Sequence, residues 1–162
     1  MHSKEKTMPM IKLRPVEFTD SKTIWEWANE PTTRSVSFSP EPIPWEQHSR
    51  WFSEKLLDPH CLFFMVLGAD DMPIGQVRYD TDGNEAVISV GLAADHRGQG
   101  YGSQAIQLAS RHVFARTAIE AIHAYIKPDN SSSIRAFTRA GFIDCASIEV
   151  HGTVARHYIL RR

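Results

Sequence analysis

The sequence predicts a mixed α/β domain, in which one sheet of about seven strands, mostly antiparallel, is flanked by about four helices. Short apolar runs separated by turn residues fill positions 61–92, as is typical of an antiparallel meander. A helical pattern over 102–116 then separates the strand predicted at 86–92 from the strand predicted at 121–126. Because a helix joins those two strands, we expect them to pair in parallel through a crossover.

The first part of the chain predicts one strand and one helix. We expect residues 1–8 to be a mobile leader ahead of a single domain over 9–162. Alternating apolar and polar side chains predict a strand at 10–14. Asp20 is suited to cap a helix that ends before Pro31, since a proline disfavours the helical conformation of the residue before it.

A long irregular connection is predicted from Pro31 to Pro44, which is rich in Pro, Ser and Thr. Such a connection is usually either functional or flexible, and a substrate-side loop is one of these two interpretations. Pro44 suits the first turn of a helix over 45–57. The apolar face of that helix includes Trp51 and Phe52, which we expect in the core.

The later elements follow from turn residues and spacing. Strands are expected at 61–67 and 74–79, and a helix at 131–140 that Gly141 closes in the left-handed conformation. A hairpin of strands 142–150 and 154–160 completes the sheet.

Composition places the chain among ordinary globular proteins. Its 162 residues are 42% hydrophobic and 23% charged, with a net charge of −1, so we expect neither a nucleic-acid partner nor a membrane partner. Met1 to Met8 lacks an apolar signal sequence, and we expect a cytoplasmic protein. Cys61 and Cys145 fit no metal-ligand spacing, so we expect reduced core thiols and no metal. The sequence does not determine the oligomeric state, and a homodimer is one possibility.

The stretch from Val90 to Ser103 carries the main functional signal. It is a predicted strand that runs through an arginine and glycine turn into a helix. Glycines at 98, 100 and 102 let backbone N–H groups approach an anion, and the following helix offers its unpaired N-terminal donors. With Arg97 adding a positive charge, the stretch predicts a site for a pyrophosphate-bearing cofactor.

Two other phosphate-binding motifs fit poorly. A dinucleotide fingerprint needs glycine at its sixth position, which is Ser103 when counted from Gly98. Its ribose-binding acid should follow the next strand, whereas Glu120 precedes it. A P-loop is excluded because no Gly-Lys-Ser/Thr follows.

The segment Arg97-Gly98-Gln99-Gly100-Tyr101-Gly102 resembles the Gln/Arg-x-x-Gly-x-Gly/Ala signature of the GNAT superfamily of acyl-CoA N-acyltransferases. A second segment, from Asn130 to Phe142, is similar to the Asn-x-x-Ser/Ala-x-x-x-Tyr-x-x-x-Gly-Phe segment of that family. The resemblance covers Met10 to Leu160 and implies the GNAT fold, with acetyl-CoA as co-substrate.

The resemblance also implies which residues hold the co-substrate. Backbone groups of the predicted strand would pair with the pantetheine amides, the glycine turn would hold the pyrophosphate, and the second segment would contact the pantetheine arm. The implied residues are Leu92, Ala93, Ala94, Arg97, Gly98, Gln99, Gly100, Tyr101, Gly102, Ser103, Asn130, Ser133 and Phe137.

Two family positions carry unexpected residues. The family's tyrosine that protonates the leaving thiolate is Phe137 here, so either water, Tyr79 or Tyr101 would have to serve, or the thiolate would leave unassisted. The family's basic glutamate matches Val87, and Glu85, on the same face of the strand, becomes the candidate base. Alternatively, Glu85 is a solvated turn residue.

Other features bear on the same chemistry. Asp95 and His96 could assist the base, and a backbone N–H of Leu92 or Ala93 could stabilise the oxyanion.

The region 29–80 resembles the branch that acetylates nucleotide-linked amino sugars for surface glycans. Candidate acceptor-binding residues are aromatic groups that could stack on a base or sugar and arginines that could meet a diphosphate: Arg34, Trp45, Arg78 and Tyr79. Enzymes that acetylate the N-terminus of ribosomal proteins are the alternative. A protein of a different class, a non-catalytic regulator that binds acyl-CoA, is a further alternative, because neither the family's acid nor its base is present at its usual position.

Overall fold

The computed structural model describes residues 10–162, so the expected leader at 1–8 lies outside the described residues. Seven strands form one sheet: β1 (Lys12–Pro15), β2 (Cys61–Leu67), β3 (Pro73–Asp82), β4 (Glu85–Leu92), β5 (Ala121–Ile126), β6 (Ile143–Val150) and β7 (Thr153–Arg161). The α-helices are α1 (Ser21–Ala28), α2 (Pro31–Ser35), α3 (Trp45–Leu57), α4 (Tyr101–Arg116) and α5 (Ser131–Arg139).

The strands follow the order β1-β2-β3-β4-β5-β7-β6 across the sheet. Every neighbouring pair is antiparallel except β4 and β5, which are parallel and joined through α4. The predicted fold class, the meander and the parallel crossover are therefore confirmed. Residues 10–162 form five α-helices rather than about four, because α2 was not foreseen.

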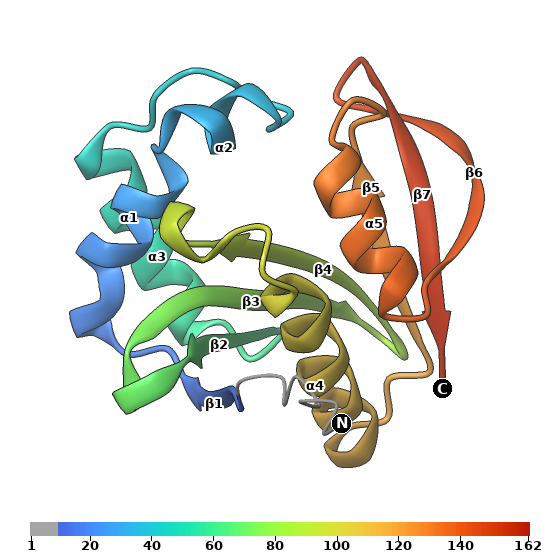
Figure 1. Cartoon of the computed structure of the whole chain (residues 1–162), viewed down its shortest axis with the longest axis horizontal. Coiled ribbons are helices and arrows are strands. Elements are labelled where there is room, and N and C mark those ends of the chain that lie inside the picture. The colour runs from blue at the N-terminus through green and yellow to red at the C-terminus, as the bar shows by residue number, and fades with distance from the viewer. Residues whose placement is uncertain (1–9) are drawn as a thin grey trace, which may run out of the picture.

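The pairing of β4 with β5 is short, and this positions the site. Glu85–Val87 pairs with Ala121–His123, after which the two strands diverge (Figure 1). On its other edge β4 stays paired with β3 as far as Leu92. We call the opening between β4 and β5 beyond this last pair the fork.

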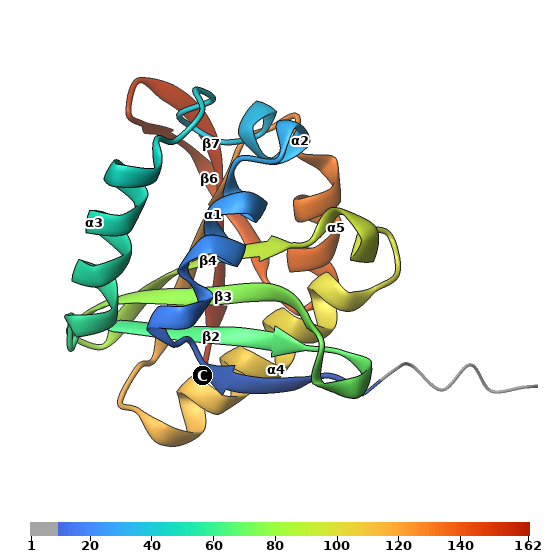
Figure 2. The same cartoon turned by 90° about the vertical axis from the view of Figure 1, so that its left-hand side faces the viewer.

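The two faces of the sheet are covered by different helices (Figure 2). On one face, α4 buries Ala105, Ile106, Ala109 and Val113, which recur at helical spacing. On the other face, α1 and α3 pack over a second cluster that includes Ile24, Phe52 and Phe63. Trp51 packs against that cluster, so the expectation that Trp51 and Phe52 belong to the core is confirmed.

Two predictions for the N-terminal half are wrong. The carboxylate of Asp20 does not cap α1, because it binds the guanidinium of Arg14 at 2.7 and 2.9 Å and accepts a hydrogen bond from the backbone N–H of Glu17. The connection expected to be irregular begins with α2. Pro31 occupies its first turn and the carboxylate of Glu30 accepts from the backbone N–H of Thr33, which are favourable conditions for starting a helix.

The two cysteines are free thiols, but only one is partly buried. Burial raises the pKa of the Cys61 thiol to about 11. Cys145 lies exposed on β6, so the prediction of a core position for it is wrong. Among residues 10–162, no helix is long and apolar enough to cross a membrane.

Candidate active site

A groove of about 630 Å³ opens between the arms of the fork. Its walls come from Ile88 to Leu92 on β4, Ala124 to Lys127 at the end of β5, the start of α4 and one side of α5 from Ser132 to Arg139. Thr32, Thr33 and Val36 to Phe38 border it from the α2 side. We call this the cofactor groove. Gly98, Gly100, Gly102, Ser103, Asn130, Ser133 and Phe137 all line it, so the structure brings together the predicted residues of both segments.

The glycine turn leaves room for an anion at the start of α4. Gly98 and Gly100 have φ angles of +74° and +84°, in the left-handed region that favours glycine. A Cβ added at Gly98 would meet no protein atom within 4 Å. Because Gly100 is the N-cap of α4, the unpaired N–H groups of the first helical turn lie beside this space. These features fit a pyrophosphate.

Two predicted turn residues make contacts of another kind. Gln99 donates a hydrogen bond to the carbonyl of Asp95, and Tyr101 packs edge-on against His96 and against the core. Neither side chain lines the cofactor groove. The structure therefore gives these side chains a role in shaping the turn.

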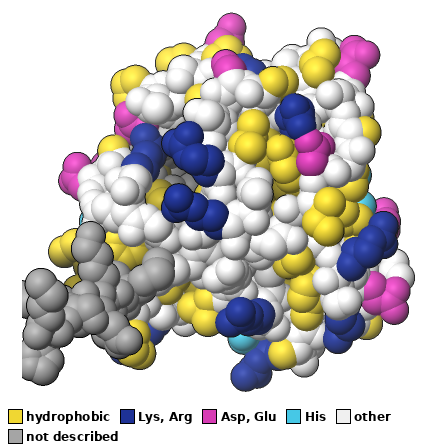
Figure 3. Space-filling model, turned by 45° about the vertical axis from the view of Figure 1, so that its right-hand side comes forward, with side chains coloured by type: hydrophobic (Ala, Val, Ile, Leu, Met, Phe, Trp, Pro, Cys, Tyr) yellow, Lys and Arg dark blue, Asp and Glu magenta, His cyan; other side chains and the backbone are white. Residues whose placement is uncertain are grey.

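Basic side chains add positive charge to the groove. Lys127, Arg135 and Arg139 line it together with Arg97. On the face drawn in Figure 3, some Lys and Arg side chains lie close together, and others lie apart from them. Phosphate groups are favoured by such a cluster. Sequence reasoning missed the first three residues, because they lie far from the glycine turn in sequence and on separate elements.

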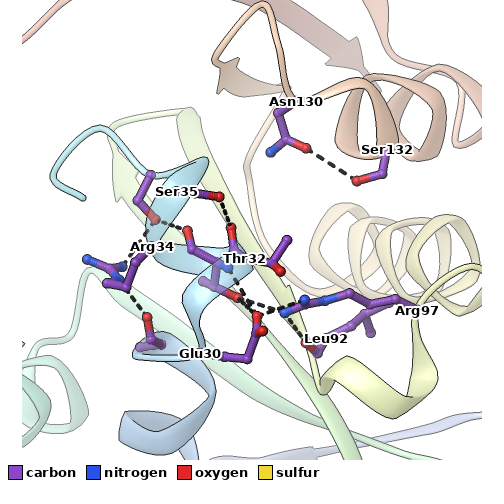
Figure 4. Close-up of polar contacts among 11 residues, drawn as sticks. Glu30, Thr32, Arg34, Ser35, Leu92, Arg97, Asn130 and Ser132 are labelled. Atoms are coloured by element: carbon purple, nitrogen blue, oxygen red, sulfur yellow. Dashed lines mark hydrogen bonds and ion pairs between the residues drawn. The ribbon is translucent and has the colours of Figure 1, made fainter. Parts of the chain in front are cut away.

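The guanidinium of Arg97 points away from the position expected for a pyrophosphate. It donates hydrogen bonds to the carboxylate of Glu30 at 2.9 Å, the hydroxyl of Thr33 at 2.7 Å and the carbonyl of Leu92 at 3.2 Å (Figure 4). This pairing lowers the pKa of Glu30 to about 2. The prediction that Arg97 contacts the anion is therefore not supported, because the side chain instead attaches α2 to the loop after β4.

The backbone of β4 offers an open edge to the groove. Ala93 donates its N–H to the carbonyl of Ile74 on β3, so this amide is not available for an oxyanion or for pantetheine. Because N–H groups alternate in direction along a strand, those of Val90 and Leu92 point into the fork. Leu92 lines the groove, whereas Ala93 and Ala94 do not, so only the first of these three predicted positions lies in the groove.

The N-terminus of α5 forms the opposite wall. The side-chain oxygen of Asn130 accepts from the backbone N–H of Ser133 at 3.3 Å and caps the helix. The same oxygen accepts from the hydroxyl of Ser132 at 3.3 Å (Figure 4). Phe137 is 6% exposed and packs against Phe142. Its position in the groove matches the family tyrosine, but it carries no proton to give.

The candidate acids and bases differ in whether they reach the groove. The carboxylate of Glu85 is half-exposed at the closed end of the fork, lines neither cavity and lies 3.1 Å from Nε2 of His123. Tyr79 is fully buried beneath α4, where its hydroxyl bonds Ser110 at 2.9 Å and burial raises its pKa. Tyr79 is therefore excluded as an acid and as an acceptor-binding residue. Tyr125, which sequence reasoning missed, lines the groove.

A second cavity of about 480 Å³ lies on the other side of β4, under α1, α2 and α3. We call it the acceptor cavity. It shares Thr33, Ser37 and Ser89 to Leu92 with the cofactor groove, so the two cavities meet along β4. Trp27, Trp51, Gln47, His48 and Gln76 also line it. Among the described residues, its lining includes no aspartate or glutamate.

The predicted acceptor-binding residues differ in availability. Arg78 lines the acceptor cavity, lies 4.9 Å above the ring of Trp51 and donates to Asp80 and Ser89. Arg34 also lines it, but its guanidinium donates to backbone carbonyls, including that of Ala28 at 2.6 Å. Arg34 is thus committed to holding the α2 region rather than a diphosphate.

Trp45 lies in neither cavity and packs edge-on against Trp25 at 5.3 Å. The prediction that Trp45 stacks on an acceptor is not supported. Asp95 and His96 also lie outside both cavities, in the turn before Arg97. Residues 10–162 contain no group of three or more His, Cys, Asp or Glu side chains that could hold a metal ion.

Comparison with known proteins agrees with this geometry. The family model of the acetyltransferase (GNAT) domain matches residues 11–143. The chain therefore belongs to the GNAT acetyltransferase family, as the two segments indicated. Acetyl-CoA is the co-substrate of this family, and the cofactor groove has the features that it requires.

The individual relatives have low sequence identity to this chain. The mycothiol acetyltransferase of Corynebacterium efficiens is 26% identical over 84% of this chain, and the chain spans 45% of the length of that relative. The crystal structure of aminoglycoside acetyltransferase AAC(6')-Ib with coenzyme A has a TM-score of 0.83 at 17% identity, covering 94% of this chain and 95% of that one. Spermidine N-acetyltransferase from Vibrio cholerae, in complex with CoA and spermine, has a TM-score of 0.82 at 18% identity, covering 93% and 95%.

Proposed function

We propose that this domain transfers an acetyl group from acetyl-CoA directly to a primary amine, and that the amine belongs to a nucleotide-linked amino sugar. One observation carries the proposal: the cofactor groove and the acceptor cavity meet along Ser89 to Leu92. An amine held in the second cavity can therefore approach a thioester held in the first. Bringing two reactants together in this way supplies much of the catalysis of a direct transfer.

The charge of the acceptor cavity supports a neutral or anionic acceptor. Relatives in complex with spermine or aminoglycosides share the fold. A polycationic acceptor, however, needs carboxylates to replace its lost hydration. The described lining contains none and includes the guanidinium of Arg78. This arrangement disfavours polyamines and aminoglycosides.

Arg78 has the features of a phosphate-binding group. Its guanidinium is stacked on Trp51 and oriented by Asp80 and Ser89. The side chain is therefore already ordered, and it loses little conformational entropy when it binds a phosphate. The side-chain oxygen Oε1 of Gln76 is buried without a hydrogen-bond partner among residues 10–162, which leaves an acceptor for an amide or hydroxyl of a ligand.

A panel of acceptors tests the proposal. Purified protein and acetyl-CoA would be mixed with UDP- and TDP-linked amino sugars, spermidine, kanamycin and peptides with free N-termini, and thiol release would be measured. We expect the nucleotide-linked amino sugars to give the highest kcat/KM. A higher value for spermidine or kanamycin would overturn the acceptor assignment, and a higher value for the peptides would favour the N-terminal acetyltransferase alternative.

The non-catalytic alternative has its own support, because Phe137 lacks a hydroxyl and Glu85 lies outside both cavities. Calorimetry separates it from the enzyme. Acetyl-CoA binding without thiol release above background for any amine of the panel would indicate an acyl-CoA-binding regulator.

A further inference from the structure

Two histidines lie side by side near the closed end of the fork and line neither cavity. Nδ1 of His123 on β5 lies 2.7 Å from Nε2 of His157 on β7. On its other side, Nε2 of His123 lies 3.1 Å from a carboxylate oxygen of Glu85 on β4. Three strands thus contribute one continuous chain of polar atoms.

The hydrogen-bond partners assign the protons of this chain. A carboxylate only accepts, so Nε2 of His123 carries a hydrogen and donates it to Glu85. A neutral imidazole has one N–H, so Nδ1 of His123 accepts and Nε2 of His157 donates. Nδ1 of His157 is then left with a free lone pair and is the proton acceptor at the end of the chain.

The surroundings keep His157 neutral. Burial, and after it the neighbouring His123, lower the pKa of His157 below its ordinary value. Tyr125 stacks on His157 with ring centroids 4.9 Å apart. On β6, the residue opposite His157 is Ala146, which does not titrate.

Two charged groups near this face are already paired, whereas Arg161, on the same face of β7 as His157 and opposite Ala121, forms no ion pair among residues 10–162. Arg156 and Tyr158 point to the opposite face of the sheet because they flank His157 in the strand, and Arg156 forms an ion pair with Asp144. The carboxylate of Asp80 on β3 is held by Lys55 and Arg78. Glu85 is therefore the charged group that acts directly on the histidine pair.

The histidines are connected to the cofactor groove through Tyr125, which lines the groove and stacks on His157. His123 forms the last pair with Val87 before β4 and β5 diverge. Tyr125 follows two residues later on the same face of β5 and lines the groove. Val87 also shares its face of β4 with Ser89, where the two cavities meet.

We propose that His157 is the general base of the transfer and that His123 and Glu85 are positioning residues that hold it in the basic tautomer. An N–H bond of the acceptor ammonium breaks, and its proton passes through one water to Nδ1 of His157. The freed nitrogen lone pair attacks the acetyl carbon, the C–N bond forms as the C–S bond of the thioester breaks, and the departing thiolate takes up the second proton of the nitrogen to leave as the free thiol. The positive charge on His157 is stabilised through His123 by the carboxylate of Glu85. This inference rests on the proposed acetyl transfer.

Nuclear magnetic resonance tests the chain without an acceptor. Long-range proton–nitrogen correlation on the 15N-labelled full chain reports the tautomer and pKa of each histidine, with His157→Gln giving the assignment. We expect an unprotonated Nδ1 on neutral His157, and a lower pKa for the pair in Glu85→Gln because the stabilising charge is lost. A protonated Nδ1 on neutral His157, or a His157 titration unchanged in Glu85→Gln, would overturn the proposal.

Kinetics supplies the second measurement, with the most active amine of the panel between pH 6 and 10. We expect His157→Gln to lower kcat/KM by about 100-fold at pH 7. The loss should shrink above the pKa of the amine, about 8 for an α-amino group, because the amine then arrives deprotonated. The dissociation constant of acetyl-CoA should not change.

His60→Gln, at an exposed turn, is the matched control and should match the parent. A loss from His157→Gln that is equal at every pH would indicate a structural role and contradict the proposal. If no amine of the panel is acetylated, the proposed function fails, while the tautomer measurement still decides on the histidine chain.

Discussion

The guanidinium of Arg97 and the carboxylate of Glu30 form an ion pair at 2.9 Å that joins the loop after β4 to the start of α2. Their residues are 67 positions apart in sequence. Because Thr33 and Ser37 of this region border both cavities, the pair helps to fix the boundary between the cofactor groove and the acceptor cavity.

Glu30→Gln should lower stability at neutral pH, by an amount that decreases as the pH falls from 4 to 3. The folded state lowers the pKa of Glu30 to about 2, so its stabilising contribution is present above the unfolded pKa of about 4.3 and is lost as pH falls toward 2. Urea unfolding at pH 7, 4 and 3 measures this. Glu54→Gln, at an exposed position of α3, is the control, and a parent-to-variant difference that stays constant with pH would contradict the pairing.

Arg78→Gln should weaken binding of the acceptor and leave acetyl-CoA binding unchanged. Loss of a charge-assisted contact is worth roughly 1.5–3 kcal/mol, so KM for the nucleotide-linked sugar should rise at least about 10-fold. Arg50→Gln, an exposed arginine of α3, is the control. Equal effects on KM for the two arginine variants would show that Arg78 does not bind the acceptor.

Phe137→Tyr should increase kcat where departure of the thiolate limits the rate. The residue lines the cofactor groove at the position where the family has its tyrosine, so the added hydroxyl can donate a proton. We expect a gain of about 10-fold in kcat, read by thiol release at saturating substrates. An unchanged kcat, with acetyl-CoA binding intact, would show that protonation of the thiolate does not limit this enzyme.

The sequence was sufficient to predict the sheet and the cofactor groove, because both depend on local signals. Alternation and turn residues predicted the strands, and the helix between β4 and β5 predicted their parallel pairing. The positive φ angles of Gly98 and Gly100 follow from the same residues that made the glycine turn recognisable.

The misplaced residues depend on contacts between distant parts of the chain. Arg34 and Arg97 looked available for phosphates, but backbone carbonyls and Glu30 occupy them. Tyr79 faces α4 because side chains alternate along β3, so that Tyr79 and Arg78 lie on different faces of the sheet. A short apolar run does not reveal which of its residues lie on which face. His123 and His157 meet only because β5 and β7 are neighbours in the sheet.

The affinity for acetyl-CoA of Gly98→Val, measured by calorimetry, tests the cofactor groove most directly. Gly98 and Gly83 have φ angles of +74° and +61°, and a Cβ added at either meets no protein atom within 4 Å. Valine is therefore strained in a comparable way at both positions, but only at Gly98 does it enter the groove.

We predict that Gly98→Val weakens acetyl-CoA binding by about 10- to 100-fold, the loss of one or two contacts to the pyrophosphate, whereas Gly83→Val binds like the parent. Parent-like affinity in folded Gly98→Val would contradict the placement of the pyrophosphate at the start of α4.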